Sequence, residues 1–238
     1  MQGLGHLLWP GVCMNCRGKI PAGGNGLCGD CWENLISLCG PDYCRRCGRD
    51  ASPYAVSDGV CPNCRGEQIH FDAIARAGVY AGPLQKMVLS FKGGQTELDF
   101  VLGGLICSAI QASSFLNDIE LFVPVPLHWI KRFLRGYNQS NVLAKRLKPP
   151  FAKISADLVR IRYTKAQPTM PTAVARKKNV AGAFAVRHRH PFTGRRICLI
   201  DDIKTTGATL NECAKTLKEA GASKVFALVL AVAGQNTR

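Results

Sequence analysis

The sequence predicts an α/β protein whose mainly parallel sheet is flanked by helices, with a small zinc-binding domain at its N-terminus. Short apolar runs rich in branched residues alternate with amphipathic stretches from about residue 70 onward, a pattern typical of parallel strands joined by helices. Before residue 65, eight of the twelve cysteines form four C-x-x-C pairs. We therefore expect a cysteine-rich unit over residues 1–69 and an α/β domain over residues 70–238.

The chain carries a strong and localised positive charge. Lys and Arg number 31 against 16 Asp and Glu, a formal net charge of +15. Between Lys131 and Arg196 the only acid is Asp157. Such a one-sided segment favours nucleic acid or a polyphosphate as the partner, and a solvated basic surface is the alternative.

Two features of the sequence bear on location. No run of about eighteen apolar residues occurs, so we expect no membrane-spanning helix. The segment from Met1 to Val12 lacks a basic start and is too short for a signal peptide. Because the paired cysteines are typical of metal binding in a reducing compartment, we expect a cytoplasmic protein.

The four cysteine pairs predict two structural zinc ions. Each C-x-x-C places two thiolates in one tight turn, and two such turns complete the tetrahedral coordination of one ion, whereas a single pair could be a redox dithiol. Sequential pairing is the simplest assignment, and interleaved pairing is the alternative. In sequential pairing the first set is Cys13, Cys16, Cys28 and Cys31, and the second is Cys44, Cys47, Cys61 and Cys64. The region is too small and polar to build much core, so the metal should hold its fold together.

The elements of the α/β domain follow from apolar runs and from glycine and proline punctuation. We expect strands over residues 73–80, 121–126, 159–163, 197–200 and 225–232. We expect helices over residues 82–91, 98–112, 140–147 and 210–221. Lys92-Gly93-Gly94 suits the end of the first helix. We favour the interpretation that this segment is a solvated helix end, and contact with pyrophosphate is the alternative.

Two basic segments lack a clear apolar period. Residues 131–139 are expected to form a glycine-containing turn between a strand and a helix, which suits a phosphate group or simply a solvated turn. Residues 164–180 are expected to form a long basic loop, either disordered or a lid that orders on an anion. His188 and His190 resemble loop residues and are more plausible as exposed side chains than as metal ligands.

The strongest candidate site follows the strand expected over residues 197–200. Asp201 and Asp202 come first, and five small residues then lead into an amphipathic helix. Small side chains at a helix N-terminus leave backbone N–H groups open to a phosphate. Paired carboxylates repel phosphate, so they suit ribose hydroxyls or a Mg²⁺ that holds them. The segment therefore predicts a 5-phosphoribosyl site beyond the carboxyl end of the sheet, against the alternative of ordinary turn and cap chemistry.

Residues 199–209, LIDDIKTTGAT, resemble the phosphoribosyl pyrophosphate (PRPP) loop of type I phosphoribosyltransferases. In that family the acidic pair holds the ribose hydroxyls and the Thr/Gly segment binds the 5-phosphate. The resemblance implies the first role for Asp201 and Asp202. It implies the second role for Thr205, Thr206, Gly207, Ala208 and Thr209. Lys204 departs from the pattern, because an uncharged residue is expected there.

The order of the two units resembles the ComF (ComFC-like) family, a double zinc ribbon followed by a phosphoribosyltransferase-like domain. The matching features are Val123-Pro124-Val125-Pro126, Arg132, Arg135-Gly136-Tyr137-Asn138-Gln139, Gln167, Arg176 and Asn179. The resemblance implies a cytoplasmic role in natural transformation, that is, DNA uptake. Internalised single-stranded DNA would be handled beside a competence helicase and recombination mediators.

Two functional hypotheses follow. In the first, the protein is a phosphoribosyltransferase in which Asp201 and Asp202 orient the ribose of PRPP with Mg²⁺. Arg132, Arg135, Gly136 and Arg176 would bind and stabilise the departing pyrophosphate. No general base stands out, and the acceptor is not readable from the sequence. In the second, the protein is a non-catalytic adaptor that binds single-stranded DNA, or a PRPP-sensing regulator on the same scaffold.

Overall fold

A five-stranded parallel sheet forms the centre of the molecule. The computed structural model describes residues 11–20, 26–57, 60–147, 152–164, 172–187 and 192–234. The strand order is β1-β7-β6-β2-β3, and every neighbouring pair runs parallel. The strands are β1 (Ala73–Val79), β2 (Leu121–Pro124), β3 (Lys153–Ile154), β6 (Arg196–Lys204) and β7 (Lys224–Val232). The predicted parallel α/β architecture is confirmed.

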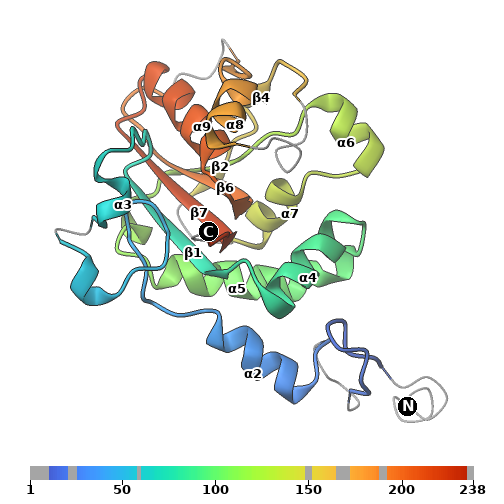
Figure 1. Ribbon diagram of the computed structural model, residues 1–238. Coiled ribbons are helices and arrows are strands. Elements are labelled where there is room, and N and C mark those ends of the chain that lie inside the picture. The colour runs from blue at the N-terminus through green and yellow to red at the C-terminus, as the bar shows by residue number, and fades with distance from the viewer. Residues whose placement is uncertain are drawn as a thin grey trace.

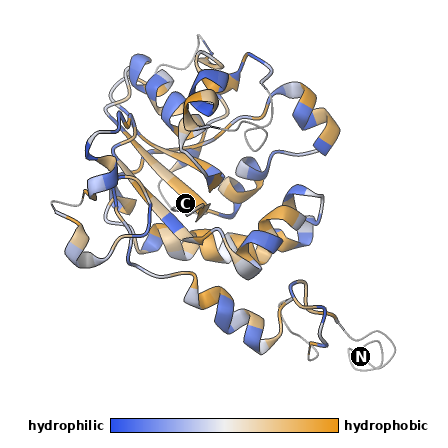
Figure 2. Cartoon of the chain, viewed as in Figure 1, coloured by the Kyte–Doolittle hydropathy of each residue, from blue (hydrophilic) through white to orange (hydrophobic). Residues whose placement is uncertain are grey.

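Helices cover both faces of this sheet (Figure 1). On one face lie α4 (Gly82–Lys92), α5 (Asp99–Gln111) and α7 (Gln139–Arg146). On the other lie α8 (Ala173–Val180) and α9 (Ala208–Glu219). Alternate residues of β6 face the two cores, because Ile200 packs on the first side and Leu199 on the second. Figure 2 shows hydrophobic residues along the central strands, with hydrophilic residues interspersed on the surrounding helices.

The remaining elements are short. The cysteine-rich region contributes α2 (Gly29–Ser37), the 3₁₀ turn Pro53–Ala55 and α3 (Pro62–Arg65). Two further 3₁₀ turns, Thr96–Leu98 and Leu116–Asp118, connect elements of the α/β domain. β4 (Leu158–Arg160) and β5 (Phe184–Val186) form a separate antiparallel pair. No helix within the described ranges is long and apolar enough to cross a membrane.

The cysteine-rich region packs directly on the α/β domain. Leu35 of α2 lies in the same apolar cluster as Leu84 and Met87 of α4. The second half of the region covers the edge strand β1, where the Ile74 N–H donates to the carbonyl of Arg45 at 2.8 Å. An uncovered edge strand is a template for unwanted pairing, so this contact protects the sheet.

Two sequence expectations about the basic segments were wrong. The expected turn over residues 131–139 is mostly a helix, α6 (Trp129–Arg135), closed by Gly136 in the left-handed region at φ 80°. Residues 173–180 of the expected loop form α8, where Thr172 Oγ1 caps the Ala175 N–H at 3.1 Å. Neither helix has a broad buried stripe, so the apolar period was missing. Residues 165–171, including Gln167, and residues 188–191, including both histidines, lie outside the described ranges.

Candidate functional site

The acidic pair lies on β6, close to its carboxyl end. The strand continues to Lys204 instead of stopping at residue 200, because β7 pairs with it along its whole length. Asp201 lies opposite Val229 in this register. Open α/β sheets bind ligands at this end of their strands, so the pair is placed where a site is expected.

Asp201 is a carboxyl group with a raised pKa. Burial, and then the adjacent Asp202 carboxylate, raise the pKa of Asp201 to about 7. Two donors act in the opposite direction: the Ser140 hydroxyl donates to Asp201 Oδ1 at 3.1 Å, and the Asp202 N–H donates to the same atom at 2.9 Å. A carboxyl that titrates near neutrality beside a second acid is typical of a functional site.

Asp202 pairs with a lysine from a distant part of the chain. Lys92 Nζ lies 3.0 Å from Asp202 Oδ2, and both side chains are mostly buried. Lys92 is the last residue of α4 and is followed by Gly93 and Gly94. The expectation of a solvated helix end was therefore wrong for Lys92.

The segment Thr205–Thr209 forms the turn before α9 and the first two residues of that helix. Gly207 takes the N-cap position at φ 82° and supplies no side-chain cap. This left-handed backbone conformation favours glycine, and a Cβ here would also lie 2.9 Å from Cε of the flexible Lys204 side chain. A small hollow is formed by Asp201 and the residues from Ile203 to Leu210. The predicted loop residues and Asp201 are thus brought together around one cavity.

A second, larger pocket adjoins the acidic pair through Lys92. It has a volume of about 400 Å³. Its lining residues are Lys92, Gly93, Gly94, Lys131, Leu134, Arg135 and Tyr163. Burial lowers the pKa of Lys131, and the charges of Arg160 and Arg135 lower it further. Three cations around one cavity suit a polyphosphate.

The predicted basic residues divide between this pocket and the outer surface. Arg135 lines the pocket, and its Nη1 donates to Gln139 Oε1 at 2.8 Å. Arg132 lies on the exposed side of α6, and Arg176 lies on α8. Neither lines the pocket. Gly136 ends α6 and also lies outside the lining.

Two residues of the site were not predicted from the sequence: Tyr163 lines the larger pocket, and Ser140 bonds to Asp201. Lys131 belongs to the basic segment that was expected to suit a phosphate, and contact of Lys92 with pyrophosphate was the alternative for its segment. Ser140 is the second residue of α7, whose N-cap Asn138 donates from Nδ2 to the Val125 carbonyl at 3.0 Å. A usable sequence signal was the position of Asn138 directly before the helix, which is typical of an N-cap.

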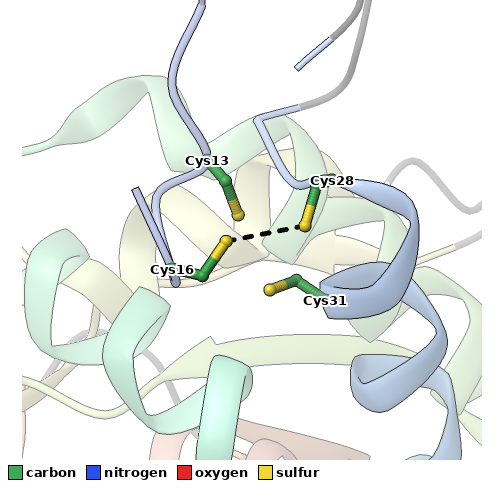
Figure 3. Close-up of side chains that lie close together, drawn as sticks. All are labelled: Cys13, Cys16, Cys28 and Cys31. Atoms are coloured by element: carbon green, nitrogen blue, oxygen red, sulfur yellow. Dashed lines mark hydrogen bonds between the residues drawn. The ribbon is translucent and has the colours of Figure 1, made fainter. Parts of the chain in front are cut away.

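The eight paired cysteines gather in two clusters with the sequential rather than the interleaved arrangement. In each cluster one sulfur atom from every cysteine lies within 4.8 Å of the others. Figure 3 shows the four side chains of the first cluster converging, with Cys16 and Cys28 sulfurs 3.6 Å apart. In the second cluster the Sγ atoms of Cys44 and Cys64 lie 3.7 Å apart, and those of Cys47 and Cys61 lie 3.6 Å apart.

These distances fit tetrahedral zinc. A Zn–S bond of about 2.3 Å sets neighbouring sulfurs about 3.8 Å apart. Burial alone would raise the pKa of Cys13, but backbone N–H groups led by that of Cys16 overcome it and lower the pKa to about 6. The same type of donors lowers the pKa of Cys44 to about 7 against the effect of burial. Each cluster thus contains one thiol that readily becomes the thiolate that zinc requires.

Comparison with protein families and known proteins covers nearly the whole chain. The family model described as a double zinc ribbon domain matches residues 4–65. Competence protein F of Haemophilus influenzae is 31% identical over 220 residues, which cover 90% of this chain and 93% of that protein. DNA utilization protein YhgH of Escherichia coli is 28% identical and is covered to 94%, with 91% of this chain. Competence protein ComFC of Bacillus subtilis is 26% identical over 82% of this chain and 79% of its own length.

Solved structures show only a distant likeness. An allosteric regulatory enzyme of purine biosynthesis aligns over 56% of this chain and 26% of its own, with 18% identity and a TM-score of 0.37. A hypoxanthine phosphoribosyltransferase from Trypanosoma cruzi aligns over 65% of this chain and 71% of its own, with 13% identity and a TM-score of 0.32.

Proposed function

The chain belongs to the competence protein F family, and we propose on this basis that it is a PRPP-binding protein that serves DNA uptake in the cytoplasm. One observation supports PRPP as the ligand. Lys92 joins two cavities, because it pairs with Asp202 beside the Thr205–Thr209 hollow and also lines the basic pocket. PRPP has the matching order of groups: a 5-phosphate, a ribose diol and a pyrophosphate.

Each group of PRPP has its own partners in this proposal. The 5-phosphate binds the Thr205–Thr209 segment at the start of α9. The ribose hydroxyls bind Asp201 and Asp202, which would also hold the Mg²⁺ that accompanies the pyrophosphate and neutralises part of its charge. The pyrophosphate binds Lys92, Lys131 and Arg135. Arg132 and Arg176 would act only by moving toward the ligand.

We propose transfer of the phosphoribosyl group as the reaction. The bond between the anomeric carbon and the pyrophosphate oxygen breaks with both electrons leaving on oxygen, and an acceptor nucleophile forms the new bond to carbon. Cations aimed at the leaving group stabilise the charge that develops there. A panel of nucleobases and amines tests this step, since pyrophosphate release with one of them is expected and release with none rejects the transferase.

Binding is tested with two ligands that share all groups but one. PRPP and ribose 5-phosphate are titrated, with Mg²⁺, into the full zinc-loaded chain. We expect Lys131→Ala and Arg135→Ala to weaken PRPP by about 10- to 100-fold, the value of one charged hydrogen bond, and to leave ribose 5-phosphate unchanged. Lys145→Ala, on the last turn of α7, is the matched control. Equal loss for both ligands would remove the pyrophosphate assignment.

A second function, binding of single-stranded DNA, is favoured by the surface of α6. Trp129, Phe133 and Leu134 are 70%, 84% and 78% exposed on this helix. Its other residues include Lys131, Arg132 and Arg135, and it contains no acid. Exposed aromatic rings between cations are typical of surfaces on which the bases of a single strand stack.

Oligonucleotide anisotropy tests this second function. Trp129→Ala/Phe133→Ala should weaken single-stranded DNA by at least about 10-fold, because stacking contributes about 1–3 kcal/mol per base. Phe100→Ala is the control, since Phe100 is a similarly exposed ring on α5. Affinity should fall with salt by a logarithmic slope of about −0.7 per phosphate contact. A flat salt response, or equal affinities for the three proteins, rejects DNA binding on α6.

A PRPP-sensing regulator would combine both functions. Lys131, Leu134 and Arg135 belong to α6 and also line the basic pocket, so ligand in the pocket contacts the DNA-binding helix directly. Saturating PRPP is then expected to change the affinity for DNA, and linkage requires the reciprocal change. Independent affinities would exclude the regulator.

A further inference from the structure

The helix α6 presents two faces, and the basic pocket uses only one of them. Lys131 and Arg135 line that pocket. Trp129, Arg132 and Phe133 are three and four residues apart, so they lie together on the outer face of the helix. All three are exposed, and the Arg132 guanidinium has no ion pair or hydrogen bond within the described residues. The outer face of α6 therefore offers a cation and two aromatic rings to a partner.

The outer face of α2 carries the opposite charge. The helix buries Cys31 and Leu35, whereas Trp32, Glu33 and Ile36 are exposed on its other side. It contains no Lys or Arg. In the part of the chain that the structure describes, the Glu33 carboxylate has no ion pair or hydrogen bond. The outer face of α2 thus combines an acid with an aromatic and an aliphatic side chain, which complements the outer face of α6.

The net charge of the chain makes this acidic face unusual. Two copies that each carry a formal charge of +15 repel one another, so their association favours a contact at which an acidic patch meets a basic one. Glu33 and Asp30 form such a patch, three residues apart on α2. Most other acids of the described residues already hold a cation, as Asp99 holds Arg146.

The two faces lie on either side of α4 (Figure 1). Leu84 of α4 shares an apolar cluster with Leu35 of α2. At the other end of α4, Lys92 lines the same pocket as Lys131 of α6. Leu89 adds an exposed apolar side chain on α4 itself. A two-fold axis through this surface reverses the order of the three helices, so it sets α2 of one copy opposite α6 of the other.

We propose that the protein forms a two-fold dimer in which α2 of each copy binds the outer face of α6 of the other. Glu33 pairs with Arg132 of the second copy, and the apolar side chains beside each charge pack together. Leu89 lies near the axis and meets its own copy. Stable interfaces bury about 1,200–2,000 Å² in total, so two symmetric contacts serve better than one between helices of nine and seven residues. The dimer does not rest on PRPP, and single-stranded DNA on α6 would compete with it.

Sedimentation equilibrium of the full zinc-loaded chain tests the dimer. The mass of the wild type should approach that of two chains as the concentration rises. Glu33→Arg and Arg132→Glu should each weaken association by at least about 10-fold, because each sets like charges opposite one another at both contacts. Glu219→Arg is the matched control, since it makes the same charge change at an exposed position of α9, on the other face of the sheet. This control should dimerise as the wild type does.

Restoring opposite charges separates a lost contact from a folding defect. Glu33→Arg/Arg132→Glu should dimerise again. An equimolar mixture of the two single variants should do the same, because their chains are complementary at both contacts. A single-chain mass for the wild type at its highest soluble concentration would overturn the proposal, as would dimers that persist in both single variants.

Two further outcomes would also overturn the dimer. One is a mass that grows beyond two chains, since an open head-to-tail assembly has no two-fold axis. The other is the absence of any rescue in the double variant and in the mixture. PRPP titration decides the proposed function separately, so the failure of one proposal is not mistaken for the failure of the other.

Discussion

Lys92 Nζ lies 3.0 Å from Asp202 Oδ2 and connects the end of α4 to the end of β6. The pair links the acidic site to the basic pocket that Lys92 also lines. Lys92 also opposes the rise in the pKa of Asp201, whose charge is otherwise disfavoured by burial and by Asp202. One cation therefore stabilises both carboxylates and is in place to meet a pyrophosphate.

Removing Lys92 should weaken PRPP binding and change its pH dependence. Lys92→Ala takes a cation from the pocket and removes the ion pair of Asp202, next to the Asp201 carboxyl. We expect a loss of about 10- to 100-fold in PRPP affinity, measured by calorimetry. The apparent pKa that governs binding should rise, because Lys92 no longer favours ionised Asp201. Lys92→Arg should recover part of both effects, and an unchanged pH profile in Lys92→Ala would contradict the coupling.

Asp201→Asn should stabilise the fold at neutral and alkaline pH. The pKa of Asp201 is about 7 in the folded protein, against about 4 in an unfolded chain. Between these two pH values Asp201 keeps its proton in the folded state and releases it in the unfolded state. The contribution of Asp201 to the free energy of unfolding is therefore complete below pH about 4 and is lost as the pH rises toward 7. The melting temperature of the variant minus that of the wild type should rise over this interval and then level off.

The control for this experiment is Glu97→Gln, at an exposed carboxyl. Its melting temperature should follow that of the wild type at every pH. A constant difference between Asp201→Asn and the wild type from pH 4 to pH 8 would contradict the raised pKa.

Gly207→Ala should destabilise the protein and weaken PRPP. The backbone there is left-handed at φ 82°, and the new Cβ would lie 2.9 Å from Lys204 Cε. The backbone term alone costs about 1–2 kcal/mol in the free energy of unfolding, measured with urea. Gly104→Ala is the matched control inside α5, where a Cβ meets nothing within 4 Å. That substitution should stabilise by about 0.5–1 kcal/mol. Equal effects of the two would contradict the left-handed backbone at Gly207.

Each purified chain should contain two zinc ions. Cys47→Ser removes a buried ligand of the second cluster, so metal analysis should find one ion. The melting temperature should also fall, because the cysteines of this cluster belong to the segment that covers β1. Cys39→Ser is the control, since Cys39 lies outside both clusters and its thiol donates to the Leu35 carbonyl. Two ions retained in Cys47→Ser would contradict the assignment.

Local sequence was sufficient for the elements with a clear apolar pattern. The buried residues Leu210, Cys213, Ala214 and Leu217 mark α9 as expected, and β1, β2, β6 and β7 follow their apolar runs. The short strands β3 and β5 were not predicted, because they contain only two and three residues. The acidic pair, the small-residue loop and the cysteine pairs were also readable, because each is a short contiguous motif. α6 was not, because its apolar side chains are exposed and form no buried stripe.

Contacts between distant segments could not be predicted in the same way. Lys92 meets Asp202 only because the order β1-β7-β6 brings the end of α4 beside the end of β6. The face of the sheet on which the Lys204 side chain lies depends on a break in the alternation of side chains along β6. Asp202 and Ile203 both face the α4 side, which turns Lys204 toward the α9 side. An alternating strand would have sent it the other way.

Calorimetric titration of PRPP with Mg²⁺ into the zinc-loaded chain and into Asp201→Asn/Asp202→Asn tests the central claim most directly. The account predicts saturable binding to the wild type and loss of that binding in the double variant, with folding and zinc content preserved. Equal affinity in the two proteins, or no binding to a folded, zinc-loaded wild type, would contradict it.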